Sequence, residues 1–170
     1  MMRKVGRILS SARAVPFLLV GLALVFSACS SVECPLNNTV YSVYSLKGKV
    51  DTLKDTLTIS AIRANGTDTV LWNRSTNTTS FQLPMSYGQE VDVLVFQLID
   101  TTQTLRTDTV RVGKTNEPHF ESVECGPVFF HTITGVSSTK NAIDSIVISN
   151  SKVTYDNTKT HFNIYFKPRD

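Results

Sequence analysis

Short segments of alternating apolar and polar residues recur along this chain, and they constrain its fold more than any other feature. Near the C-terminus, Phe162, Ile164 and Phe166 alternate with polar neighbours, so an extended strand there would have one apolar face. The same period of two appears in residues 57–61 and 81–85, whereas no long stretch repeats with the period of a helix. The pattern therefore predicts an all-β fold.

Turn residues divide this pattern into about eight to ten short strands. The predicted strands are residues 40–46, 57–61, 68–72, 81–85, 91–99, 105–112, 120–133 (broken at Gly126-Pro127), 143–149 and 161–167, with a hairpin turn at Asn65-Gly66 and a loop over 113–118. Pro84 cannot donate to a strand ladder, which predicts an edge strand. Residues 91–99 are apolar on both faces through their middle, which predicts a central strand buried on both sides. The number and spacing of strands favour a single immunoglobulin-like β-sandwich, with a small antiparallel β-barrel as the alternative.

The N-terminus has the order of a secretory signal peptide. A basic segment without acids is followed by the apolar residues 14–26 and by the small residues Ser27 and Ala28. A transmembrane helix is the alternative, but it needs roughly 20 apolar residues, and this run is shorter and contains Pro16. We therefore expect residues 1–28 to be a signal peptide that is removed.

Phe26-Ser27-Ala28-Cys29 resembles the bacterial lipobox, in which the cysteine is acylated, for example with palmitate, and the signal is cleaved just before it. Phe26 stands where leucine is usual. We expect a lipid on Cys29, a short tether over residues 29–39 and a β-sandwich domain over 40–170; an ordinary secreted protein is the alternative. Ser30 follows the cysteine in place of Asp, which by resemblance to lipoprotein sorting favours the outer membrane, on its periplasmic or its surface face.

The formal net charge of +3 does not indicate a nucleic-acid partner. Four of the 17 Lys and Arg residues lie in the expected signal peptide, which leaves 13 against 14 Asp and Glu, a net charge near −1. Phosphate-backbone binding needs clustered Lys and Arg. The mature chain has only one close pair in sequence, Lys47 and Lys49, so we expect no nucleic acid among the partners.

The three cysteines have separate expected roles. Cys29 is the lipid acceptor, which leaves Cys34 and Cys125 as an even pair in an oxidising compartment. We predict a Cys34–Cys125 disulfide, with two independent thiols as the alternative. No Cys or His residues have the spacing of a metal site, so no metal and no cofactor are expected.

No catalytic motif is present in the sequence. His119, His131 and His161 are separated, and Glu117, Glu121 and Glu124 are interpreted as a solvated face rather than as catalytic carboxylates. The nucleophile elbow and the glycine-rich phosphate loop are both absent. The sequence therefore predicts no catalytic residue; an envelope hydrolase with a site assembled from distant residues is the alternative. Four aromatic residues are candidates for a binding surface or, alternatively, for the core: Tyr41, Tyr44, Trp72 and Tyr87.

The order of short motifs in the second half, from residues 81–85 through Glu124-Cys125-Gly126 and residues 141–146 to residues 161–166, resembles an uncharacterised family of small Bacteroidetes-type lipoproteins. The resemblance implies a lipobox signal, one all-β domain and a cell-envelope location, and it supplies no activity. The expected function is thus a lipid-anchored, non-catalytic binding or structural module of the envelope. Its partner would be an envelope protein or glycan, and an accessory subunit of an outer-membrane complex is a further alternative.

Overall fold

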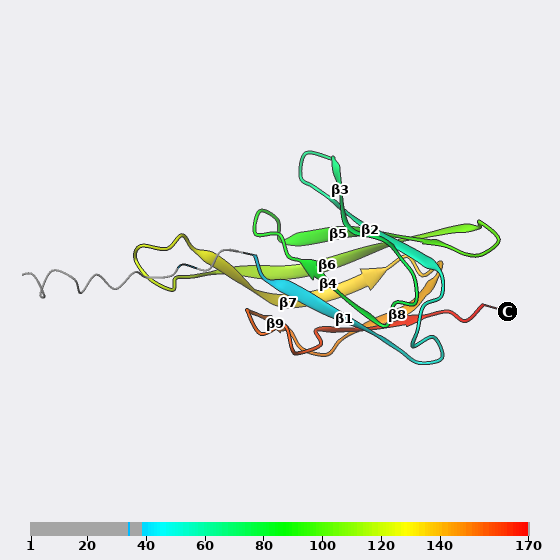
Figure 1. The fold of residues 1–170 in the computed structure, drawn as a ribbon. Coiled ribbons are helices and arrows are strands. Elements are labelled where there is room, and N and C mark those ends of the chain that lie inside the picture. Colours follow the sequence, from blue (N-terminus) through cyan, green and yellow to red (C-terminus); the bar gives the residue numbers. More distant parts are fainter. Residues whose placement is uncertain (1–33, 35–38, 170) are drawn as a thin grey trace, which may run out of the picture. The chain divides into compact units, whose positions relative to one another are not determined.

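The computed structural model describes Cys34 and residues 39–169, and the strands of this part form two β-sheets (Figure 1). The strands are β1 (Tyr41–Lys47), β2 (Thr56–Ile62), β3 (Asp68–Ser75), β4 (Ser80–Pro84), β5 (Val91–Ile99), β6 (Leu105–His119), β7 (Val128–Ser138), β8 (Ile143–Ile148), β9 (Lys152–Val153) and β10 (Phe162–Phe166). The four-stranded sheet has the order β4-β1-β10-β8, and the six-stranded sheet has the order β3-β2-β5-β6-β7-β9. Within these described residues no helix has the length and apolar character needed to cross a bilayer.

One hydrophobic core fills the space between the two sheets. Phe81 on β4 stacks against Tyr44 on β1, with ring centroids 4.9 Å apart, and meets Phe96 on β5 edge-on at 6.0 Å. Phe162 on β10 completes the stack on the other side of Tyr44 at 4.6 Å. All four rings are buried, and burying one such side chain stabilises the fold by about 1.5–3 kcal/mol. The predicted single β-sandwich is confirmed, as two packed sheets and not as a closed barrel.

Strand pairing fixes which connections share an end of the sandwich. β1 runs parallel to β10, the last strand, whereas every other paired strand runs antiparallel to its neighbour. β4 pairs only with β1 and forms the edge of its sheet, as Pro84 predicts. The β6–β7 loop therefore lies at one end of the sandwich, and the residues after β10 lie at the other (Figure 1).

β5 has its predicted bounds and its predicted central place, but burial on both sides is a wrong prediction. Leu94, Phe96 and Leu98 face the core and are buried, whereas Val93 and Val95 on the outer face are only half-buried. In the described part of the chain, the four-stranded sheet covers the inner face of the six-stranded sheet and no second layer covers its outer face. Branched apolar residues there contribute to strand propensity and to packing between neighbours within the sheet.

β6 is longer than predicted, because residues 113–118 continue the strand instead of forming a loop. The β6–β7 register shifts between Gly113 and Lys114 at a β-bulge, after which pairing resumes as far as His119 opposite Val128. The polar sequence of this segment conceals the strand, but its backbone groups are paired with β7.

Asp108, at the other end of β6, fixes the connection between β7 and β8. Its side chain is fully buried, and its carboxylate accepts hydrogen bonds from the backbone N–H groups of Asn141, Ala142 and Ile143 at 2.6, 2.6 and 2.9 Å. The Thr139 hydroxyl donates a fourth bond at 2.7 Å. Burial alone would raise the pKa of Asp108, but these hydrogen bonds together hold the pKa below its ordinary value. Asp108 thus satisfies the donors of a turn that would otherwise be buried without partners.

Candidate functional site

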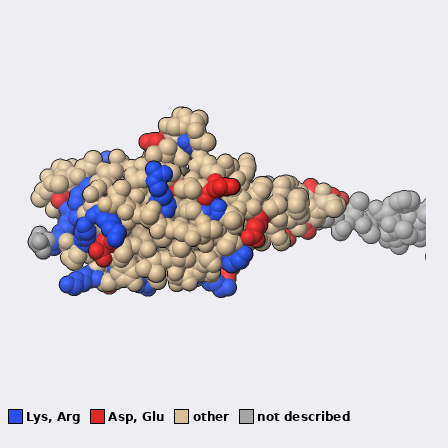
Figure 2. Space-filling model, turned by 180° about the vertical axis from the view of Figure 1, so that it is seen from behind, with Lys and Arg blue, Asp and Glu red and all other residues tan. Residues whose placement is uncertain are grey.

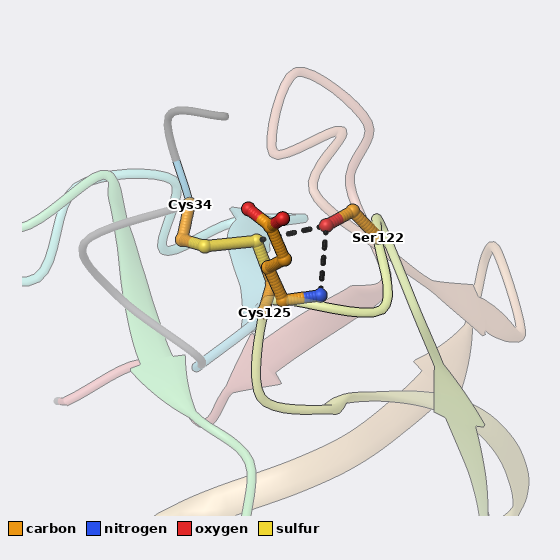
Figure 3. The surroundings of a disulfide bond; sticks show 4 residues. Cys34, Ser122 and Cys125 are labelled. Carbon is orange, nitrogen blue, oxygen red and sulfur yellow. Dashed lines mark hydrogen bonds between the residues drawn. A yellow bond between two sulfur atoms is a disulfide. The ribbon is translucent and has the colours of Figure 1, made fainter. Parts of the chain in front are cut away.

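The covalent junction between the N-terminal segment and the sandwich is the first part of the site. Cys34 and Cys125 form a disulfide across 91 residues of sequence, with their Cα atoms 5.5 Å apart, which confirms the predicted pairing (Figure 3). Two hydrogen bonds accepted by Ser122 stabilise the β6–β7 loop around Cys125. The Ser122 carbonyl accepts from the Cys125 N–H at 3.3 Å, and the Ser122 hydroxyl oxygen accepts from the Glu124 N–H at 3.1 Å. The disulfide therefore fixes Cys34 to the β6–β7 loop. Cys29 lies outside the described residues, as do the expected signal peptide and most of the tether.

The β6–β7 loop exposes apolar side chains beside this junction. The Phe120 side chain is 63% exposed, and Val123 is fully exposed. Between them lies Glu121, which contacts the His119 imidazole at 3.2 Å on the surface. Glu117, Glu121 and Glu124 are all exposed, in agreement with their interpretation as a solvated face. This end of the sandwich therefore combines carboxylates with isolated apolar side chains.

The four candidate aromatic residues divide between core and surface. Tyr44 is a core residue, and Trp72 is half-buried against Phe81 at 5.8 Å. Tyr41 and Tyr87 are exposed, and Tyr87 stacks on Phe129 of β7 with ring centroids 5.0 Å apart. Only Tyr41 and Tyr87 can therefore contribute to a binding surface.

Tyr87 belongs to a loop that borders an open cavity of about 460 Å³. The cavity lies between the end of β2, the segment 84–89 and the start of β5. Its lining is mixed: Ala61, Leu71 and Met85 are apolar, whereas Arg63 and Asp92 are charged. A cavity of this size and mixed character can receive a short peptide segment or a sugar unit.

Asp92 and Lys114 form a buried ion pair beneath this loop. The Lys114 Nζ donates to an Asp92 carboxylate oxygen at 2.9 Å and to the Gln89 carbonyl at 2.8 Å, and the Lys114 side chain has no exposed surface. The Ser86 N–H approaches the second carboxylate oxygen at 3.4 Å. Burial raises the pKa of Asp92, although the ammonium of Lys114 opposes the shift. Both Asp92 oxygens are thus engaged in holding the loop.

The sequence carries a signal for the Asp92–Lys114 ion pair and for Asp108, although no motif marks these residues. Asp108, Val110, Val112 and Lys114 alternate in phase, and in the structure all four are buried on the inner face of β6. Asp92 is likewise in phase with Leu94, Phe96 and Leu98 on β5. A charged residue that continues an apolar alternation is expected to be buried and therefore paired.

The three histidines do not meet one another. His119 stacks on Phe130 at 4.3 Å. His161 is buried, where its Nδ1 accepts from the Val43 N–H at 2.9 Å, and burial lowers its pKa. His131 is buried and its Nδ1 lies 2.8 Å from the Asn116 Oδ1. Burial, and after it the charge of Lys114, lowers the pKa of His131 to about 4. These contacts give the histidines structural roles.

The buried His131 predicts a loss of stability in mild acid. Its pKa is about 4 in the folded chain and about 6.5 in an unfolded one, so between these values only the unfolded state binds the proton. We expect the wild-type protein to lose about 2 kcal/mol more than His131→Gln between about pH 7 and about pH 5. Urea unfolding at each pH measures this difference. If the wild type and His131→Gln lost the same unfolding free energy over this pH range, His131 would not be the group responsible.

Among the described residues that line the cavity, Asp92 is the only carboxylate, and no histidine is present. In the described part of the chain, no group of three or more His, Cys, Asp and Glu side chains could hold a metal ion. The arrangement of the cavity is suited to binding through apolar contacts and a few hydrogen bonds. Among the described residues of its lining, no hydroxyl group is hydrogen-bonded to a histidine or a carboxylate.

Fold and site together define a small all-β domain whose N-terminal segment is joined to it by a disulfide. The chain belongs to DUF6452, a family of unknown function, whose sequence profile matches residues 56–166. The match includes Asp92, Asp108, Lys114 and Cys125 but begins after Cys34. No curated protein and no solved structure matches the chain.

Proposed function

We propose that this protein is a lipid-anchored module of the cell envelope that binds an envelope protein or glycan and performs no catalysis. The observation that carries the proposal is the disulfide. Cys34 and Cys125 are joined to each other, and Cys29 is the third of the three cysteines in the chain. Cys29 therefore remains available for acylation, at the position where the lipobox-like sequence places it.

The disulfide also supports attachment close to the membrane. Cys34 lies five positions beyond Cys29 in the sequence. An extended chain spans at most about 3.6 Å per residue, so the domain would begin within roughly 18 Å of the lipid. Each buried methylene of an acyl chain adds about 0.8 kcal/mol, and two or more chains anchor a protein stably. The residues after Cys29 favour the outer membrane as its location.

A binding role fits the site better than catalysis does. The open cavity beside Tyr87 has apolar walls and a carboxylate that the buried Lys114 already engages. Exposed Tyr41 and Tyr87 add the amphipathic aromatic surface that is common in recognition sites.

The anchor is tested by replacing Cys29 with alanine in the full chain. We expect Cys29→Ala to lose incorporation of an alkyne-tagged fatty acid and to leave the membrane fraction, because the only thiol outside the disulfide is gone. Ser30→Ala is the matched control and should remain labelled and membrane-bound. Continued lipid labelling of Cys29→Ala would overturn the proposal.

A further inference from the structure

The strand topology gathers cationic side chains at the end of the sandwich opposite the disulfide. Several segments meet there, and four of them are considered for their charge: the β1–β2, β5–β6 and β7–β8 connections, each with its adjoining strand ends, and the chain after β10. They supply Lys47, Lys49, Lys54, Arg106, Lys140, Lys167 and Arg169, which is seven of the 13 Lys and Arg residues outside the expected signal peptide. No sequence window contains this cluster, because its members come from distant parts of the chain.

The two ends of the domain differ in net charge, although Asp51, Asp55, Asp100 and Asp144 lie among the seven lysines and arginines of the cationic end. The described glutamates, Glu90, Glu117, Glu121 and Glu124, lie toward the disulfide end, on or beside the start of β5 and the end of β6. In Figure 2, Lys and Arg side chains gather at one end of the molecule, and several acidic side chains lie toward the other. At about 3.3 Å per residue, the 15 residues of β6 place these two ends roughly 45 Å apart.

A cavity of about 210 Å³ lies within the cationic end. Its charged lining consists of Lys49, Lys54, Arg106, Lys167, Arg169 and Asp55, and we call this set the distal basic pocket. Arg169 bridges Asp55, at 2.5 Å, and Asp100, which lies beside the pocket. The pocket is lined by five cations and one carboxylate, and Asp100 beside it adds a second carboxylate, so three positive charges remain in excess.

Arg106 retains donors that no described group uses. Its guanidinium reaches Asp55 only at 3.6 Å, and its Nε–H is buried without a hydrogen-bond partner among the described residues. Lys49 and Lys54 are exposed and have no ion-pair partner in the part of the chain that the structure describes. An arginine fork beside free ammonium groups is the donor set that binds phosphate.

We propose that the distal basic pocket binds a phosphoryl group that carries at least two negative charges, either as free phosphate or as a phosphate ester on an envelope glycan. A single carboxylate would neutralise only one of the three excess charges, whereas a phosphoryl dianion offers three acceptor oxygens to Arg106, Lys49 and Lys54. This inference adds a ligand class to the proposed binding module, and it does not depend on the lipid anchor.

The experiment is calorimetric titration of the full chain, in nonionic detergent and at constant ionic strength, with three probes: inorganic phosphate, glucose 1-phosphate and acetate. We expect saturable binding of a phosphoryl probe and none of acetate. Binding of both phosphoryl probes supports recognition of the phosphoryl group itself, and binding of only one assigns the source as free phosphate or as an ester. Absence of saturable phosphoryl binding, or equal binding of acetate, would overturn the proposal.

Two variants locate the binding in the pocket. Lys49→Gln combined with Lys54→Gln, and separately Arg106→Gln, should each weaken phosphoryl binding at least about tenfold, because each removes charge-assisted hydrogen bonds. Lys159→Gln removes one exposed charge outside the pocket and should change affinity less than about twofold. If Arg106→Gln fails to fold, the double variant of Lys49 and Lys54 still tests the pocket, because both lysines are exposed. If Lys159→Gln weakened phosphoryl binding as much as the pocket variants do, the distal basic pocket would not be the binding site.

The test is separable from that of the anchor. Cys29→Ala should bind the phosphoryl probe as the wild type does, since the pocket lies at the end of the sandwich opposite the disulfide. If the pocket variants lose phosphoryl binding but keep their lipid label, the result bears on the distal basic pocket and leaves the lipid anchor unaffected.

Discussion

Replacing Asp108 with asparagine should lower the free energy of unfolding by about 3–5 kcal/mol. The carboxylate accepts four hydrogen bonds from Thr139, Asn141, Ala142 and Ile143. An asparagine of the same shape keeps one acceptor oxygen and turns an NH₂ group toward the other donors. At least two buried donors then lose their partner, at about 1–3 kcal/mol each. Urea denaturation of wild type and variant measures the difference.

Asp144→Asn is the matched control for Asp108, because Asp144 is exposed on β8, close to the same connection. Its replacement should change the unfolding free energy by no more than about 0.5 kcal/mol. The lowered pKa of Asp108 adds a pH signature: its contribution is complete above the ordinary pKa of aspartate and is lost as the pH falls through the folded-state value. A loss below about 1 kcal/mol in Asp108→Asn would show that the turn does not depend on this charge.

Removing the disulfide should have an effect of similar size. For a loop closed across 91 residues, the chain-entropy treatment gives about 4–5 kcal/mol of stabilisation at 25 °C. We expect the double variant Cys34→Ser with Cys125→Ser to be less stable by up to this amount, chiefly because its unfolded chain gains conformational freedom. Thermal unfolding with and without reductant provides the same comparison in the wild type.

Cys29→Ser serves as the control for the disulfide, since it removes a thiol without touching the Cys34–Cys125 bond. Its unfolding free energy should equal that of the wild type, and reductant should still destabilise it. If reductant left the stability of the wild type unchanged, the disulfide would have no role in holding the domain together.

The fold was largely predictable because alternation depends only on local sequence. The strands predicted over residues 91–99 and 161–167 match β5 and β10 almost to the residue, since each has an uninterrupted period of two between turn signals. The strand over residues 113–118 is not predictable in this way, because glutamate, asparagine and proline are typical of a loop unless the pairing with β7 is known. Strand order and the parallel β1–β10 pair depend on contacts between distant segments, which alternation does not encode.

The site was less predictable, for two physical reasons. Asp108 lies within β6, and the hydrogen bonds that its buried carboxylate accepts come from residues more than 30 positions away in the sequence. The distal basic pocket takes lysines and arginines that are scattered singly along the chain. The predicted disulfide succeeded because it depended on a count of cysteines and on the compartment, and neither requires knowledge of the fold.

The position of the disulfide also determines how the domain would carry a mechanical load. A pull on the chain ahead of Cys34 passes through the sulfur bridge into Cys125, and so into the β6–β7 hairpin and not into β1. A counter-pull at Arg106 acts on the other end of β6, so the tension runs along the extended backbone of that strand. A strand pulled at both of its own ends carries the load through its covalent bonds, and the ladder between β6 and β7 is not sheared. Reduction of the bridge would redirect the same tension into β1 and change the force at which the domain unfolds.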